Sequence, residues 1–358
     1  MPSNDSHIAS PLKIGFTYDL RSEWIAAGLT PDQCQEFEDI EYIERMAAAL
    51  RKLGSVDMIG GAKALTKRLA SGNSGWDVVF NFCEGYGTVT REAQVPALLE
   101  AWGITTTLSD SATMALCQDK GRSKMVLEHY GIPTAPFACI PPRGSWDASR
   151  YDPMSLLHQC KHREALATFP LFVKPSSVST GIGIDSTNKV RNHDELVNIL
   201  DCMSRKYPDQ SILVESFLQG REFTVGIIGT GRDARVIGIS EFTFHGDLDV
   251  YGYASKCFDS PNPTRHSLPM SSPVAQDVAK VALDAWKILG CRDGGRIDIR
   301  HDTKGPMAKP MFIEVNPIPG LKGPDLSDLP WLAKENGISH DNLIASIVHS
   351  ALKRKDDL

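Results

Sequence analysis

Two stretches near the C-terminal end of the chain place acidic, amide and basic side chains two residues apart. "GGRIDIRHD" carries Arg296 and Asp298, and "MFIEVNPIPG" carries Glu314 and Asn316. Side chains two apart on a β-strand share a face, and by the same count Phe312 lies on the face of Glu314. A connection rich in glycine and proline would let the two strands pair antiparallel. The two acids and the amide would then converge, with Arg296 beside them.

A small cluster of hard oxygen ligands suits Mg²⁺ or Mn²⁺, which takes one or two protein carboxylates together with waters and substrate phosphates. The Pro-Ile-Pro-Gly turn that follows Asn316 would hold such a cluster in place. The same alternation also fits the polar outer face of an amphipathic hairpin. These two strands alone therefore leave both interpretations open.

A third stretch, "FPLFVKPSSVSTGIGI", has the composition of a phosphate-binding element. Its apolar strand ends at Lys174, and a loop of Ser, Thr and Gly follows from Ser176 to Gly183. Glycines let backbone N–H groups close on an anion, and a lysine supplies the point charge that phosphates favour. The G-x-x-x-x-G-K-[ST] pattern of a P-loop is absent. A serine-rich hairpin turn is the alternative interpretation.

Three further segments carry polar groups that a nucleotide could use. In "ILVESFLQGREFTV" a strand runs into a short linker, so the backbone from Glu215 to Leu218 could contact an adenine edge. Glu222 could accept hydrogen bonds from ribose hydroxyls. Lys120, on a helix face, and Lys256, on a long loop that could close as a lid, could each contact a phosphate. Each of these residues taken singly also fits an ordinary solvent-exposed charge.

The elements that must position these residues fall into three regions. From residue 13 to about 108, short apolar strands alternate with amphipathic helices, and "ITTTL" (104–108) is the last strand. This alternation is typical of an open parallel sheet. One helix is predicted over 111–130, and residues 140–165, rich in proline, glycine and charge, are interpreted as an excursion on a small second domain. The third region consists of strands, a loop over 245–270, a helix over 272–290 and a C-terminal helix from about residue 340.

The composition limits the class of protein. A chain of 358 residues suits two or three domains, and 42% hydrophobic residues can build their cores. The net charge of −6 argues against a nucleic acid or an anionic membrane as the main partner and favours small molecules. The 8 cysteines show no C-x-x-C, so reduced thiols in a cytoplasmic protein are expected. Neither a signal peptide nor an apolar run of about 18 residues is present.

In chain order, these segments resemble the ATP-grasp superfamily, and within it the D-alanine–D-alanine ligase-like branch of carboxylate–amine ligases. The resemblance covers roughly residues 75–330 and is most specific in "GGRIDI" and "FIEVNPIPGL". It implies an α/β (α+β) fold with an N-terminal open parallel domain (1–112), a small central subdomain (113–210) and a C-terminal antiparallel-sheet subdomain (211–358). ATP would lie between the last two, and a homodimer would form through the N-terminal domain.

The resemblance also implies the reaction and the residues that carry it. ATP phosphorylates a substrate carboxylate, and an amine displaces phosphate to leave an amide or dipeptide and ADP. Two Mg²⁺ ions would be held by Asp298, Glu314 and Asn316. The catalytic set would be Arg296, Lys256 and Gly320. The ATP-binding set would be Lys120, Lys174, Ser176, Thr180, Gly181, Glu215, Ser216, Phe217, Leu218, Glu222 and Lys256.

The N-terminal region departs from the family pattern. Members that join two D-alanines carry Gly-Gly-x-Ser-x-Glu after the first strand, with a glutamate for the first substrate's ammonium group. Here the equivalent stretch reads "FTYDLRSEW", in which Tyr18, Asp19 and Glu23 are candidate replacements. The segment "NFCEGYGTVTREAQVPALLE" is longer than its family counterpart. Its Glu84 and Glu92 are expected at the mouth of the cleft, although Glu92 also suits a helix N-terminus.

The acceptor side departs from the pattern as well. The family's serine pair in the phosphate loop appears as Thr180 and Gly181, and a later serine aligns with Asp325 in "GLKGPDLSDLP". An aspartate facing a carboxylate would repel it, so the predicted acceptor is not D-alanine and is neutral or cationic at that point. The neighbouring Lys322 could instead bind a carboxylate, so an acceptor that carries a carboxylate stays open.

Three function classes fit at least part of this pattern. The first is an ADP-forming ligase that acts on a small-molecule carboxylate and an amine. The second is a nucleotide-binding sensor or scaffold without catalysis, which would have no need of Arg296 together with a metal set. The third, a dinucleotide-dependent oxidoreductase, lacks G-x-G-x-x-G after "KIGF".

Overall fold

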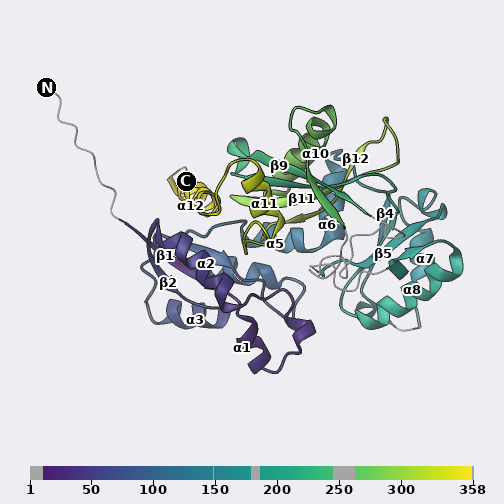
Figure 1. The fold of residues 1–358 in the computed structure, drawn as a ribbon. Helices are drawn as coiled ribbons and strands as arrows, with labels where there is room; N and C mark the ends of the chain where they lie inside the picture. Colours follow the sequence, from purple (N-terminus) through teal and green to yellow (C-terminus); the bar gives the residue numbers. More distant parts are fainter. Residues whose placement is uncertain (1–10, 148, 179–185, 245–262, 357–358) are drawn as a thin grey trace.

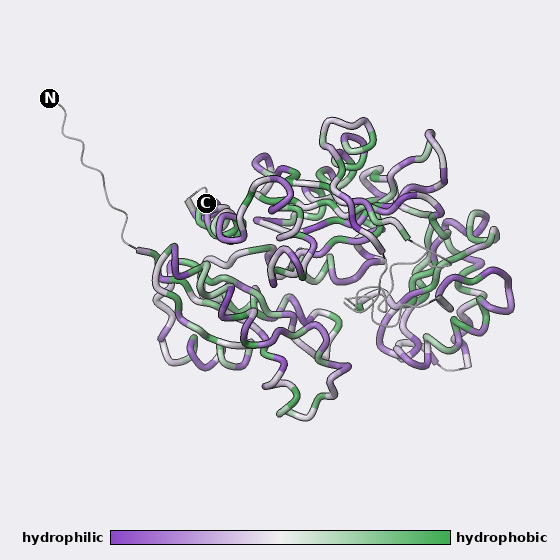
Figure 2. The backbone as a smooth tube through the Cα atoms, in the orientation of Figure 1, coloured by the Kyte–Doolittle hydropathy of each residue, from purple (hydrophilic) through white to green (hydrophobic). Residues whose placement is uncertain are grey.

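The computed structural model describes residues 11–147, 149–178, 186–244 and 263–356 (Figure 1). Within these residues the strands form a three-stranded, a four-stranded and a five-stranded sheet. Figure 2 shows hydrophobic stretches along the strands and mostly hydrophilic stretches in the outer connections. The mixture of one parallel sheet and two antiparallel sheets agrees with the predicted fold class.

The N-terminal sheet has the strand order β2-β1-β3, and both pairs are parallel. Its strands are β1 (Leu12–Tyr18), β2 (Gly54–Met58) and β3 (Val78–Phe82). The helices that follow the sheet strands or link them are α1 (Arg21–Ala26), α2 (Ile40–Arg51), α3 (Ala62–Ala70) and α4 (Gln94–Ala101). The predicted strand "ITTTL" is reduced to one bridge, between Val79 and Thr106. The other strands that the alternation predicts, over 13–19, 55–60 and 76–82, are confirmed.

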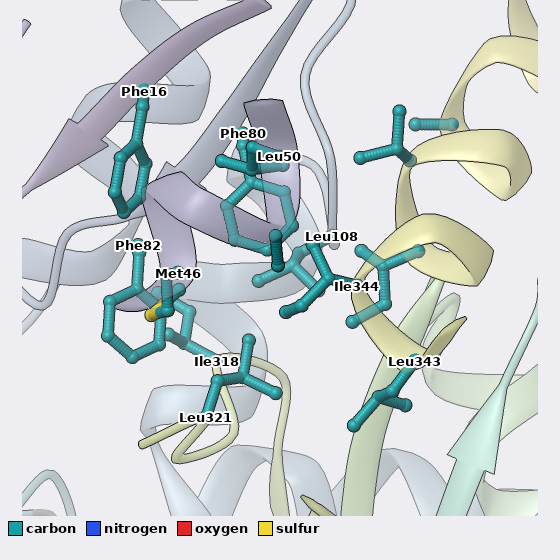
Figure 3. Packing of buried hydrophobic residues seen from close by; sticks show 14 of the residues in the cluster. Phe16, Met46, Leu50, Phe80, Phe82, Leu108, Ile318, Leu321, Leu343 and Ile344 are labelled. Atoms are coloured by element: carbon teal, nitrogen blue, oxygen red, sulfur yellow. The ribbon is translucent and has the colours of Figure 1, made fainter. Parts of the chain in front are cut away.

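The core of this domain receives residues from the far end of the chain. Leu343, Ile344 and Ile347 of α12 (His340–Asp356) join the cluster that contains Phe16 and Phe80. Figure 3 shows Ile344 beside Leu108, with Phe80, Ile318 and Leu321 in the same cluster. Packing therefore ties the last helix of the predicted segment 211–358 to the N-terminal core.

The four-stranded sheet is antiparallel, with the order β4-β7-β5-β6. Its strands are β4 (Phe137–Ile140), β5 (Leu171–Pro175), β6 (Lys189–Val190) and β7 (Ile212–Ser216). Helices α7 (Pro153–His158) and α8 (His193–Lys206) contribute to its core. The strand β7 pairs with β4 and β5, although the predicted boundary at 210/211 places it in the next domain.

The five-stranded sheet has the order β10-β9-β8-β11-β12 and is antiparallel throughout. Its strands are β8 (Glu222–Ile228), β9 (Arg235–Thr243), β10 (Thr264–Ser267), β11 (Gly294–His301) and β12 (Pro310–Asn316). The helix α10 (Pro273–Leu289) buries Trp286 against one face. The helix α11 (Asp328–Glu335) packs on the other face. The strand β10 falls inside the stretch predicted as a loop.

The single helix predicted over 111–130 is two helices, α5 (Ser111–Gln118) and α6 (Lys120–His129). Asp119 separates them in an extended conformation (φ −93°, ψ 100°), and its side chain accepts a hydrogen bond from Arg122 N. Aspartate competes with the helix for backbone donors in this way, which favours a cap over a helix interior. The break frees Lys120 N, which donates to Ser176 O at 3.0 Å.

Candidate active site

The hairpin of β11 and β12 brings the predicted cluster together. Arg296 pairs with Asn316 and Asp298 with Glu314 in an antiparallel register. Asn316 Nδ2 lies 3.4 Å from Asp298 Oδ2, and Arg296 Nη2 lies 3.7 Å from the same oxygen. The convergence expected from the spacing of two residues is therefore present.

One placement on this hairpin was wrong. The register shifts between Asp298 and Ile299, so that Ile299 pairs with Phe312. A bulge adds one residue to a strand, and one residue reverses the alternation of its side chains. Phe312 is consequently fully buried among Ile297 and Ile299 in the apolar core, on the face opposite Glu314.

Asp298 has a neighbour that sequence reasoning missed. Thr224 on β8 is the register partner of Asp298, and its Oγ1 donates a hydrogen bond to Asp298 Oδ1. Thr224 is buried, so this contact fixes the orientation of the carboxylate. Thr224 lies two residues after Glu222, but only the pairing of β8 with β11 reveals which strand it faces.

A buried carboxylate links the central sheet to α6. Glu215, on β7, accepts from Lys124 Nζ at 2.7 Å and from Lys174 Nζ at 2.8 Å. Burial would raise the pKa of Glu215, but the two ammonium groups outweigh it and lower that pKa to about 2. The Glu215 side chain is thus bound to lysines, whereas the prediction concerned its backbone.

The two lysines differ in their surroundings. Burial lowers the pKa of Lys124 below its ordinary value, although Glu215 opposes the change. Burial also acts to lower the pKa of Lys174, but the charges of Glu215, Glu314 and, more weakly, Glu222 raise it overall. Lys174 therefore interacts electrostatically with carboxylates of both antiparallel sheets.

Lys124 was not among the predicted residues. It is fully buried and also donates to Thr134 Oγ1 at 2.9 Å and to Phe312 O at 3.1 Å. The predicted Lys120 lies one turn earlier on α6, where Nζ donates to Val178 O at 2.6 Å and lies 3.4 Å from Glu314 Oε2. The spacing "KGRSK" puts both lysines on one helix face, which was the available signal.

The segment predicted to contact adenine joins the two antiparallel sheets. The N–H groups of Ser216 and Phe217 donate to Pro136 O and Pro170 O of the central domain. The ring of Phe217 lies under Lys189 Nζ, 4.0 Å from the ring centroid, and near the guanidinium of Arg300. For the Leu218 N–H, no acceptor is found among the described residues.

The remaining predicted ATP-binding residues fall into two groups. Glu222 pairs with Arg300 Nη1 at 2.9 Å, and both side chains are mostly buried. Ser176 accepts from Gly121 N at 3.1 Å and donates to Asp119, so it closes the start of α6. The other group, Thr180, Gly181 and Lys256, lies outside the described residues.

Four acidic side chains of the N-terminal domain, at the carboxyl ends of β1 and β3, form a group that we call the acidic wall: Asp19, Glu36, Glu84 and Glu92. Asp19 follows β1 and accepts from Trp24 Nε1 at 3.0 Å and Gly85 N at 2.8 Å. Glu84 follows β3, and its pKa lies well above the ordinary value because of burial and the charges of Glu92 and Glu36. Ligands of open α/β sheets bind beyond the carboxyl ends of strands where the order reverses, as it does between β1 and β3.

Arg91 is the main cation of this wall. Its Nη2 lies 3.0 Å from Glu36 Oε2 and 3.7 Å from Glu92 Oε1, and its Nη1 donates to Ser177 O at 3.2 Å. The wall therefore contacts the segment that follows Lys174. Of the candidate replacements for the family glutamate, Asp19 is buried in this wall, Tyr18 is half-buried at the end of β1, and Glu23 is exposed on α1.

Asp325, predicted to face the acceptor, lies at the surface, and its role toward the acceptor stays a prediction. Its side chain is 86% exposed and lies 3.7 Å from Lys334 Nζ at the surface. The turn at Gly323 (φ +137°) directs the chain outward, and the following Ser327 returns beside Gly320, where an added Cβ would lie 3.0 Å from Ser327 Oγ. Lys322 pairs with Glu38 at 3.0 Å. The predicted turn is anchored on both sides of Gly320, by Ile318 and Leu321 in the N-terminal core (Figure 3).

The described part of the chain contains neither a membrane-spanning helix nor a group of three His, Cys, Asp or Glu side chains arranged to hold a metal ion. Among the described residues, none of the helices combines the length and apolar character needed to span a bilayer. Within the same residues, no three His, Cys, Asp or Glu side chains gather into a metal-binding group. The hairpin instead offers two carboxylates and one carboxamide, a small set of the kind that Mg²⁺ accepts because it keeps several waters.

Comparisons with known proteins identify the family of this chain. The family model "D-ala D-ala ligase C-terminus" matches residues 126–349. The D-alanine–D-alanine ligase of Marinobacter nauticus is 31% identical over 279 residues, which cover 77% of this chain and 75% of the relative. The chain belongs to the D-alanine–D-alanine ligase family. The corresponding ligase of Rhizorhabdus wittichii is 29% identical over 87% of this chain and 90% of its own length.

Solved structures of the family share the fold. The D-alanine–D-alanine ligase of Bacillus anthracis complexed with ATP has a TM-score of 0.71 at 21% identity, covering 97% of this chain and 99% of that chain. The VanG D-Ala:D-Ser ligase of Enterococcus faecalis has a TM-score of 0.69 at 19% identity, covering 96% and 100%. Family membership confirms the predicted ATP-dependent, ADP-forming ligase class. These relatives are all named as ligases, and none of them as a sensor or a scaffold.

Proposed function

We propose that this protein joins the carboxylate of an amino acid to an amine at the polar face of the β11–β12 hairpin. The observation that carries the proposal is the convergence of Arg296, Asp298, Glu314 and Asn316 on one face. Lys120 and Lys174 approach that face from other elements. A nucleotide held there would lie between the central and C-terminal sheets, with its phosphates toward the lysines and its adenine beside residues 215–218.

The hairpin residues fit a divalent cation. All three candidate ligands offer hard oxygen atoms, and Thr224 already orients one of them. Lys120 Nζ lies 3.4 Å from Glu314 Oε2, so this face attracts positive charge in the structure. Asp298, Glu314 and Asn316 would hold Mg²⁺ or Mn²⁺, in two ions as the family resemblance implies. The bound metal would supply charge neutralisation of the outer phosphates.

Protein groups account for the other parts of the reaction. Arg296 would donate N–H groups to the oxygen that becomes negative when the amine attacks, a contribution worth about 3 kcal/mol for a single donor. Lys120 and Lys174 would contact the ATP phosphates, and Lys256 and Gly320 remain predicted members of the catalytic set. Positioning and charge then suffice, and no protein nucleophile is needed.

The acidic wall supports a donor substrate that carries an ammonium group. Glu84 lies at the carboxyl end of β3, and the structure records no ion pair or side-chain hydrogen bond for its carboxylate among the described residues. The charges of Asp19, Glu36 and Glu92 act on it, and the guanidinium of Arg91 opposes them. An α-amino acid bound by its ammonium group here would direct its carboxylate toward the hairpin. D-alanine, the substrate in the relatives' names, is the first donor to test.

The test is product formation with a substrate panel. The protein is incubated with ATP, Mg²⁺ and D-alanine, alone and with other amino acids and amines, and ADP, AMP, phosphate and product mass are measured together. ADP and phosphate in equal amounts with one amide product are expected. Formation of AMP and pyrophosphate would refute the proposal. ATP hydrolysis that yields no amide with any combination of donor and acceptor would also refute it.

Assembly and location are secondary proposals. The family resemblance supports a homodimer through the N-terminal domain, which light scattering coupled to size-exclusion chromatography would test. The described cysteines are free thiols, and four of them are buried, which supports the cytoplasm as the location.

A further inference from the structure

The helix α11 lies close to the face of the sheet that carries Arg296. Gly226 on β8 and Gly238 on β9 are register partners, and Gly226 also pairs with Arg296. A Cβ added to Gly226 would lie 2.9 Å from Leu329 Cδ1, and one added to Gly238 would lie 2.5 Å from Asn336 Nδ2. Both glycines therefore leave the space that α11 fills, on the same face as Arg296.

The first residue of α11 bridges two arginines. One carboxylate oxygen of Asp328, Oδ2, contacts Arg296 Nη1, and the other, Oδ1, accepts from Arg265 Nη1 at 2.7 Å. The Asp328 and Arg296 side chains are 13% and 14% exposed, so the pair is largely shielded from water. A shielded ion pair holds its geometry better than a surface pair does.

Arg265 has a second contact with the same helix. It lies on β10, and its guanidinium stacks over the ring of Trp331, 4.2 Å from the ring centroid. Trp331 lies three residues after Asp328, so α11 presents an anion and an aromatic face to one arginine. A cation over an indole ring is favourable when partly desolvated, and it fixes the plane of the guanidinium.

Arg296 also has a competing carboxylate beside it. Its Nη2 lies 3.7 Å from Asp298 Oδ2, the proposed metal ligand. Without Asp328, attraction would draw the guanidinium toward Asp298, where it would neutralise a carboxylate that the cation needs. Asp328 therefore both orients Arg296 and keeps it apart from the metal ligands.

We propose that Asp328 is a positioning residue for Arg296 and that Arg265, stacked on Trp331, holds Asp328 in place. The inference rests on the proposed function, because it takes Arg296 as a group that touches the reacting atoms. It adds a role for three residues, Asp328, Arg265 and Trp331, to that function.

The principal test is Asp328→Asn, with Glu335→Gln as the matched control because Glu335 is exposed at the other end of the same helix. For Asp328→Asn, kcat is expected to fall about 10- to 100-fold, as for a small misplacement of a catalytic group, with KM for ATP within about twofold. Mn²⁺ binding in the presence of ATP, followed by electron paramagnetic resonance, is expected to weaken about fivefold or more. Glu335→Gln should match the parent protein in all three measurements. A kcat of Asp328→Asn within about twofold of the parent would overturn the proposal.

Chemical rescue separates positioning from loss of structure. Formate added to Asp328→Ala supplies a carboxylate at the vacated place and should restore kcat at least about tenfold, whereas chloride should not. A variant that melts early and gains nothing from formate would show a structural role and overturn the proposal. Arg265→Gln should lower kcat less than Asp328→Asn does, and the double variant should be no worse than Asp328→Asn alone. If the losses in kcat of the two single variants added up in the double variant, Arg265 would not act through Asp328.

Arg296→Lys, measured in the same series, distinguishes the two levels of inference. Full turnover by Arg296→Lys would contradict the proposed function itself. An inactive Arg296→Lys together with a fully active Asp328→Asn would refute only the positioning role of Asp328.

Discussion

The buried carboxylate of Glu215 gives the strongest quantitative prediction. Its pKa falls from 4.5 to about 2 in the folded protein, since Lys124 and Lys174 outweigh the effect of burial. Each pKa unit corresponds to about 1.4 kcal/mol, so the carboxylate stabilises the fold by about 3 kcal/mol at neutral pH. Glu215→Gln keeps the shape but removes the charge, and we expect it to lower the free energy of unfolding by about 3 to 5 kcal/mol at pH 7.

The sign of the pH dependence follows from the direction of the shift. A lowered carboxyl pKa contributes stability that is fully present above the unfolded value of 4.5 and is lost as the pH falls toward about 2. The difference in the free energy of unfolding between the parent protein and Glu215→Gln should therefore shrink by about 2 kcal/mol between pH 7 and pH 3.

Urea unfolding at the two pH values, followed by circular dichroism, measures this difference. Glu241→Gln is the matched control, because Glu241 binds Arg221 in a more exposed ion pair that is worth at most about 1 kcal/mol. A loss below about 1 kcal/mol for Glu215→Gln at pH 7, or a difference that does not narrow at pH 3, would refute the reasoning.

Two further predictions concern other contacts. Thr224→Val should raise the Mg²⁺ concentration needed for half-maximal stabilisation of the ATP complex about 10-fold or more, because Asp298 loses the donor that orients it. Thr224→Ser keeps a hydroxyl donor and should retain most of the affinity. A thermal-shift titration with Mg²⁺ measures both variants. Arg354→Met should lower the free energy of unfolding in urea by about 3 to 5 kcal/mol, because it leaves a buried carboxylate unpaired. Arg354 Nε donates at 3.0 Å to the fully buried Asp293, and Nη2 donates to Thr106 O at 2.9 Å. A loss under about 1 kcal/mol would contradict this prediction.

Much of the hairpin could be predicted from the sequence. The period of two residues in a strand, together with a turn long enough to reverse the chain, brings Asp298 opposite Glu314. Phe312 was misplaced because a bulge depends on how a strand fits its neighbours and leaves no signal in the alternation itself. The break at Asp119 did have a local signal, an aspartate that caps the next helix, and the apolar pattern on both sides concealed it.

Partners of charged side chains were much less predictable. The spacing of Lys120 and Lys124 put both on one face of α6, but only the packing of α6 against β7 and β12 decides that Lys124 is the buried one. The pairing of Asp328 with Arg296 joins residues 32 positions apart through a helix that was not predicted. Asp325, chosen by alignment, lies at the surface instead.

By itself, the sequence determined the kinds of chemistry available to this protein, because residue types and strand periodicity depend on the chain's immediate neighbours. It thereby specified an oxygen-rich face with an arginine beside it, and the order of segments that the ligase family shares. Only the tertiary structure decided which charges meet, since ion pairs form where distant elements pack and where water is excluded. The bridge of Asp328 between two arginines, and the lysines around Glu215, belong to that second kind.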